Sequence, residues 1–228
     1  MNPFQQIENA VKHSVDEILQ HPFFMRLGKG ICTKNELKIF AQQYYLYCEF
    51  FPKVLALVAS KVPDDQTRFP LIENLWDEHG RGDLEKSHRA LFKSFVYAVG
   101  LSDQELSQNP PLPFVFDYIE KAMTACDSHP FLYGLGFLGI GLEQFTSAEY
   151  QIIYDALHQY DFSEPGLTFW KEHIGLDDLH YAGFIQAASP WLKTEQDIRL
   201  LKKGAEEAIA LEKALWDGLD AYLLAETA

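Results

Sequence analysis

The sequence predicts an all-α protein built as a helical bundle. No segment alternates apolar and polar residues for long enough to predict a strand. Apolar residues instead recur every three or four positions in successive segments, which is the period of an amphipathic helix. Proline, glycine and hydroxyl-bearing residues separate these segments where helices would begin and end. We therefore expect about seven or eight helices in a single domain that spans residues 1–228.

The first half of the chain carries four of the expected helices. The first has its apolar residues along one side and ends at His21-Pro22. Thr33 and Glu36 have the spacing of a capping box for the second helix. In the third, Pro70 falls in the first turn, where a proline is tolerated. The expected helices span residues 4–20, 34–61, 69–79 and 83–99.

The second half carries four more. Ser128-His129-Pro130 and Ser163-Glu164-Pro165 each pair a cap residue with an early proline, which is typical of a helix start. No internal repeat divides this half of the chain. The expected helices span residues 114–125, 129–160, 165–188 and 194–225.

The composition disfavours several classes of protein. Apolar residues make up 47% of the 228 residues, so we expect a sizeable core. The net charge of −14 repels nucleic acid and anionic membrane surfaces, so neither is an expected partner. Cys32, Cys48 and Cys126 form no CxxC pair, which is typical of a reducing compartment. With no signal peptide and no apolar run long enough to cross a membrane, we expect a cytoplasmic protein.

The strongest sign of chemistry is the group His173, Asp177 and His180. Their spacing is i, i+4 and i+7, which on one helix places the three side chains within an arc of about 60°. Two imidazoles and a carboxylate suit iron, manganese or zinc. A polar helix face that merely contains two histidines is the alternative interpretation.

Glu143 is a candidate for metal binding or catalysis because of the residues before it. It follows a run of apolar, tyrosine and glycine residues from Phe131 to Leu142. A carboxylate buried beside such a run is costly unless it is paired or bound to a metal. The glycines of the run indicate close helix approach or room for a ligand.

Glu78 and His88 extend the candidate site to the first half of the chain. His88 lies among apolar residues on its expected helix, and Asp77, Glu78 or Glu85 could pair with it. A hydrogen-bonded core histidine and solvated carboxylates are the alternative interpretation. Glu49 is a weaker candidate for an additional ligand, because a position in solvent would explain it equally well.

Three carboxylates and three histidines from several helices suit two metal ions that share a carboxylate. Such a centre leaves positions for O2 or a substrate, whereas a zinc hydrolase typically needs only three protein ligands. The candidate ligands are Glu78, His88, Glu143, His173, Asp177 and His180.

These residues resemble the ligand pattern of a known family, the haem-oxygenase-like diiron oxidases. The pattern is His173-x3-Asp177-x2-His180, preceded by Glu143 and by Glu78-x9-His88. The likeness covers most of the chain and is nearest to the CADD-like branch, which includes para-aminobenzoate synthases. It implies a haem-oxygenase-like bundle whose six ligands bind two iron ions, or manganese. It also implies that Glu143 is the bridging, catalytic carboxylate.

The resemblance implies a function as well. It implies an enzyme that uses O2 and an external electron donor to oxidise a small organic substrate. The reactions of the family include hydroxylation, N-oxygenation, desaturation and oxidative C–C cleavage, and a homodimer is implied too. Several aromatic residues are candidates for lining the substrate pocket, although core packing explains each of them singly: Phe24, Tyr44, Tyr47, Phe51, Phe137 and Trp170.

One departure from the nearest branch matters. Its aminobenzoate synthases use a tyrosine after the first helix as the source of the product's ring, and a lysine after the bridging glutamate. The matching positions here are Phe24 and Ile153, so we do not expect that activity to transfer. Two other classes stay open: a metal-free enzyme of the TenA or PqqC type with the same fold, and a protein-interaction module.

Overall fold

The computed structural model describes residues 2–108 and 110–226, and within these ranges every regular element is a helix. The all-α prediction is therefore confirmed. The α-helices are α1 (Pro3–Leu19), α2 (Pro22–Gly28), α3 (Lys34–Lys61), α4 (Asp65–Glu78), α5 (His88–Ala98), α6 (Asp103–Ser107), α7 (Pro113–Ser128), α8 (Phe131–Leu135), α9 (Gln144–Leu157), α10 (Glu164–His173), α11 (Leu176–Ala188) and α12 (Glu195–Glu226). Shorter helical turns are η1 (Gly80–Gly82), η2 (Leu84–Lys86) and η4 (Ser189–Trp191), and η3 (Gly136–Glu143) is a π-helix.

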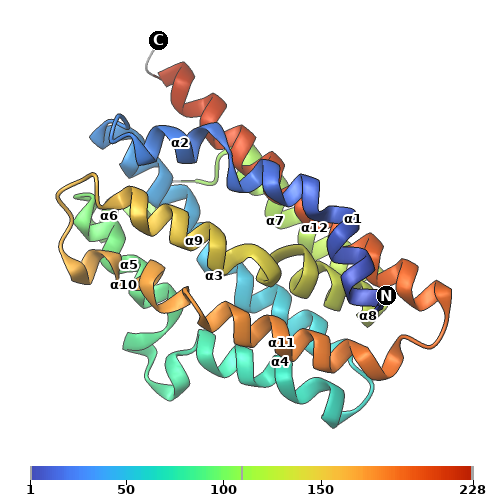
Figure 1. Cartoon of the computed structure of the whole chain (residues 1–228). Coiled ribbons are helices and arrows are strands. Elements are labelled where there is room, and N and C mark those ends of the chain that lie inside the picture. The colour runs from blue at the N-terminus through green and yellow to red at the C-terminus, as the bar shows by residue number, and fades with distance from the viewer. Residues whose placement is uncertain (1, 109, 227–228) are drawn as a thin grey trace.

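The helices form a bundle with its longest helix along one side (Figure 1). α1 lies along α12, and α11 lies beside α4 at the opposite side of the molecule. Between them, η3 contacts both α12 and α11, and α3 contacts α4, α5 and α7. No helix within the described ranges is both long and apolar enough to cross a membrane.

The structure contains more helices than the seven or eight expected, because several expected helices are divided and the short helix α6 is added. The helix expected over 129–160 is α8, the π-helix η3 and α9. His21-Pro22 ends α1 and also begins α2, since the His21 ring accepts a hydrogen bond from the Phe23 N–H. The helix expected over 165–188 is two helices, α10 and α11. Gly175, at φ +90°, turns the chain between them.

Two other boundaries move relative to the prediction. The helix expected to begin at residue 83 begins at His88, after the 3-10 turn η2. α4 begins at Asp65 rather than at residue 69, so Pro70 lies inside the helix instead of in its first turn. α4 ends at Glu78 and α5 begins at His88, so two candidate ligands lie at the ends of consecutive α-helices.

The π-helix η3 contains Glu143 and most of the glycine-rich run from Phe131 to Leu142. A Cβ on Gly136 would lie 1.9 Å from the Leu201 carbonyl oxygen on α12. A Cβ on Gly204 of α12 would lie 2.0 Å from the Tyr133 carbonyl oxygen. These glycines therefore permit close helix approach, as predicted, and η3 ends with Glu143 in the interior. π-helical turns are frequent at functional sites.

Candidate metal centre

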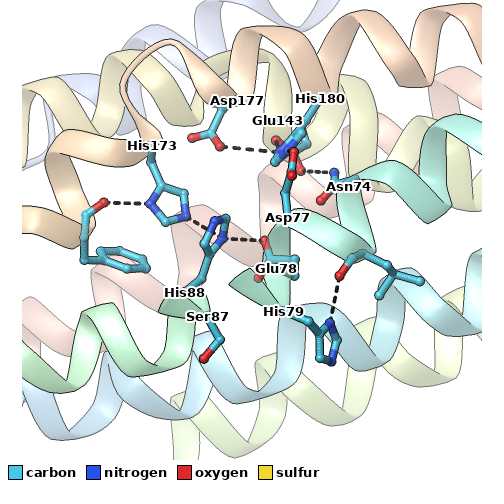
Figure 2. Close-up of polar contacts among 12 residues, drawn as sticks. Asn74, Asp77, Glu78, His79, Ser87, His88, Glu143, His173, Asp177 and His180 are labelled. Carbon is cyan, nitrogen blue, oxygen red and sulfur yellow. Dashed lines mark hydrogen bonds and ion pairs between the residues drawn. The ribbon is translucent and has the colours of Figure 1, made fainter. Parts of the chain in front are cut away.

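The six candidate ligands converge in the interior of the bundle, where they form two groups of three. In each group, one nitrogen or oxygen atom from every residue lies within 4.8 Å of the others. None of the six residues is more than 7% exposed. The first group is Glu78, His88 and His173, and the second is Glu143, Asp177 and His180 (Figure 2).

The structure divides the three residues that the sequence placed on one helix face. His173 is the last residue of α10, whereas Asp177 and His180 lie on α11. Because Gly175 turns the chain between the two helices, His173 joins the first group and the other two join the second. The prediction of a single helix face is wrong, although all three side chains still border one site.

In the first group, ring nitrogens and a carboxylate oxygen meet at short distances. His88 Nδ1 lies 2.8 Å from Glu78 Oε1 and 2.9 Å from His173 Nε2. His173 Nδ1 lies 2.7 Å from the Phe169 carbonyl oxygen, to which it donates its proton. The Nε2 lone pair of His173 therefore points to the centre, which is the arrangement found in metal-binding histidines. Figure 2 shows this row of contacts.

In the second group, one side of His180 is held by a carboxylate outside the group. His180 Nε2 lies 3.3 Å from Asp77 Oδ2, and Asp77 also accepts from Arg81 Nε at 2.5 Å. His180 Nδ1 then faces two carboxylates, at 3.6 Å from Glu143 and 3.7 Å from Asp177. Asn74 Nδ2 donates to the other Glu143 oxygen at 2.9 Å.

This arrangement leaves buried acceptor atoms without donors. Asp177 Oδ2 and His180 Nδ1 have no hydrogen-bond partner within the described residues. Burial, together with the charges of Glu143 and Glu78, raises the pKa of Asp177 well above its usual value. Burial and the neighbouring His88 lower the pKa of His173. A divalent cation in the second group would satisfy the two unpartnered atoms, and the carboxylate and imidazole donors of both groups suit iron or manganese.

The geometry separates the candidates for the partner of His88. Glu78 contacts it, whereas Asp77 supports His180 and Glu85 is exposed. Glu49 lies outside both groups, and its carboxylate accepts from Arg89 Nη1 at 2.8 Å.

Sequence reasoning missed the supporting roles of Asn74 and Asp77. Both lie on the face of α4 that also carries Glu78, at positions i, i+3 and i+4. That spacing is the signal that could have found them.

A small cavity of about 30 Å³ adjoins the candidate ligands. Tyr47 and Phe51 line it, as predicted, whereas the other four aromatic candidates do not. Tyr44 reaches the cavity indirectly, because its hydroxyl donates to that of Tyr150 at 2.9 Å. Tyr150 and Thr146 also line the cavity, although no sequence pattern pointed to them.

The fold and the site define a haem-oxygenase-like helical protein with a buried centre of carboxylates and histidines. The chain belongs to the family of iron-containing redox enzymes, whose pattern matches residues 38–213. All six candidate ligands fall within that range.

Individual relatives agree with this assignment. The 4-aminobenzoate synthase of Chlamydia muridarum is 28% identical over 224 residues, which cover 98% of this chain and 91% of that protein. A CADD-like protein of unknown function from Nostoc punctiforme has a TM-score of 0.80 at 15% identity, over 97% of this chain and 96% of the other. A domain with a haem-oxygenase-like fold from Shewanella denitrificans has a TM-score of 0.77 at 20% identity, over 97% and 94% of the two chains. The structural similarities identify the fold.

Proposed function

We propose that the protein is a non-haem diiron oxidase that uses O2 to oxidise a small organic substrate. The observation that carries the proposal is the pair of buried groups of carboxylates and histidines. In the second group, Asp177 Oδ2 and His180 Nδ1 have no hydrogen-bond partner among the described residues. Membership in a family of iron-containing redox enzymes favours iron as the cation. When bound, two ferrous ions supply the electrons with which O2 is activated.

The protein's own residues would prepare the centre. The Phe169 carbonyl and the Asp77 carboxylate each hold one ring nitrogen of a histidine, so that the other nitrogen is directed inward. Asn74 orients Glu143, which we propose as the carboxylate shared by both metals. The apolar walls of the cavity exclude water from the reaction. The proposal includes an external electron donor and places the reaction in the cytoplasm.

The test is a count of metal per chain. Ferrous iron is added without oxygen, the excess is removed, and the bound iron is measured. We expect close to two ions in the wild type and about one in His173→Ala or His180→Ala, because each variant disrupts one group. His158→Ala is the matched control, because His158 is exposed and its ring forms a hydrogen bond with the carbonyl oxygen of Tyr154, one helical turn earlier in the chain.

Two results would contradict the proposal. Two ions retained in His173→Ala would exclude the first group as a metal site. No iron in the wild type would favour a metal-free enzyme of the same fold, with the buried histidines acting as acid–base groups.

A further inference from the structure

The cavity at the candidate metal centre is too small for an organic substrate. Its volume of about 30 Å³ accommodates one or two molecules the size of water. O2 is of this size, whereas a carbon skeleton of several atoms is not. An organic substrate must therefore lie in a neighbouring space and present its reactive end to the centre.

A larger cleft adjoins the cavity. It measures about 580 Å³ and lies between α3, α5 and the turns that join α4 to α5. Cys48 and Glu78 line both spaces, so a candidate ligand separates the cleft from the cavity. Pro52, one turn after Cys48, has no N–H and removes the helical hydrogen bond to the Cys48 carbonyl. Tyr45, Leu84 and Ala90 add apolar wall against which a carbon chain could pack.

The cleft differs in charge from the rest of the molecule. The chain has 19 basic and 33 acidic residues, yet the cleft contains three basic side chains, Lys53, Arg89 and Lys93. Arg89 is paired with Glu49 at 2.8 Å, and Lys93 with Asp103, which lies outside the cleft, at 2.7 Å.

Lys53 differs from the other two basic side chains because it has no ion pair or hydrogen bond among the described residues. The cleft also contains one unpaired carboxylate, Glu85. With Glu49 and Glu78 counted as well, the cleft lining has three acidic and three basic side chains, so it is less acidic than the chain as a whole.

We infer that this cleft is the substrate site and that its substrate is a small organic carboxylate. The Lys53 ammonium would bind the carboxylate group, and the carbon chain would extend over the apolar wall toward Glu78. This inference rests on the proposed function for its chemistry, but the binding itself requires no turnover. Lys53 would act as a specificity-determining residue that never contacts the metals.

Binding of two matched probes tests the inference. Hexanoate and hexylamine have similar chains and opposite charges, and the amine tests whether Glu85 dominates instead. Their dissociation constants are measured by calorimetry on the full chain, with and without Zn(II) as a redox-inert metal. We expect hexanoate to bind, and Lys53→Gln to weaken it about two- to fivefold, the effect of losing one exposed charge pair.

Lys171→Gln is the matched control, because Lys171 is exposed and pairs with Glu164, and neither residue lines the cleft. It should leave hexanoate binding unchanged. The inference is overturned if hexanoate does not bind, if Lys53→Gln has no effect, or if hexylamine binds as tightly as hexanoate. The iron content of Lys53→Gln separates this inference from the proposed function. If the variant binds two iron ions and binds hexanoate as tightly as the wild type, this inference is contradicted and the proposed function is not.

Discussion

His173 Nε2 lies 2.9 Å from His88 Nδ1, although 85 positions separate the two residues in the chain. His173 has already donated its Nδ1 proton to the Phe169 carbonyl, so its Nε2 can only accept. Glu78 Oε1 is a further acceptor, 2.8 Å from the same His88 nitrogen. A single proton on His88 cannot bond well to both neighbours, whereas one cation can bind all three atoms.

Asp77→Asn should weaken metal binding at the second group. The Asp77 carboxylate accepts from His180 Nε2 and is itself held by Arg81, so it fixes the orientation of the His180 ring. Loss of such a partner typically costs about 10- to 100-fold in metal affinity. Competition titration with a chelator measures the affinity. Asp117→Asn is the control, because Asp117 is exposed and pairs only with Lys121. Unchanged affinity in Asp77→Asn would show that Asp77 does not support the site.

A second pair of buried carboxylates predicts a pH dependence of stability. Glu149 and Glu212 are each 2% exposed. Trp216 Nε1 donates to Glu149 Oε1 at 2.8 Å, but neither Glu212 oxygen has a hydrogen-bond partner within the described residues. Burial raises the pKa of Glu212 to about 7, and burial with the Glu212 charge raises that of Glu149 well above its usual value.

The folded protein therefore keeps a proton on Glu212 that the unfolded chain releases near pH 4.5. Because the folded pKa is the higher one, this group's contribution to stability falls as pH rises from 4.5 to about 7. Glu212→Gln should remove this loss and raise the free energy of unfolding at about pH 8, relative to wild type, by roughly 1–3 kcal/mol. Urea unfolding over this pH range measures it, with the exposed Glu206→Gln as control. Equal pH slopes in wild type and Glu212→Gln would refute the prediction.

Gly136→Ala should destabilise the fold strongly. Its Cβ would lie 1.9 Å from the Leu201 carbonyl oxygen, so η3 or α12 would have to move. Overpacking of this kind costs about 1–3 kcal/mol, and more where backbone must shift. Gly28→Ala is the control, because the nearest atom to its Cβ would be 3.9 Å away and no strain is expected. Thermal unfolding of the two variants should differ clearly; similar midpoints would disprove the close approach.

The protein should not make 4-aminobenzoate, despite its similarity to the synthase of Chlamydia muridarum. Phe24 has no hydroxyl and Ile153 has no amine, and both are buried in the core. The chain therefore lacks the tyrosine and lysine that we associate with that activity. Expression in a bacterial strain that requires 4-aminobenzoate should give no growth without the supplement. Growth would show that other residues replace the missing two.

The sequence predicts the fold class and the residue types of the site better than it predicts how the site is assembled. Helical periodicity is a local property, so α3 and α12 lie close to where they were expected. Acidic and histidine side chains beside apolar runs are chemically conspicuous, so the sequence points to all six residues that the fold brings together in the two groups. The division between His173 and Asp177 was missed, because regular spacing outweighed the one glycine that turns the chain. Helical spacing places Asp77 on the same face of α4 as Glu78, but no local pattern reveals that its partner is His180, 103 positions away.

The position of the candidate ligands at helix ends has a consequence for local stability. Glu78 is the last residue of α4, His88 the first of α5 and His173 the last of α10. Helix ends open more readily than the rest of a folded protein, because fewer backbone bonds hold them. Metal bound at these three ends would join segments that otherwise open independently. Amide exchange and proteolysis there should slow on metal binding, whereas the middle of α12 should respond little.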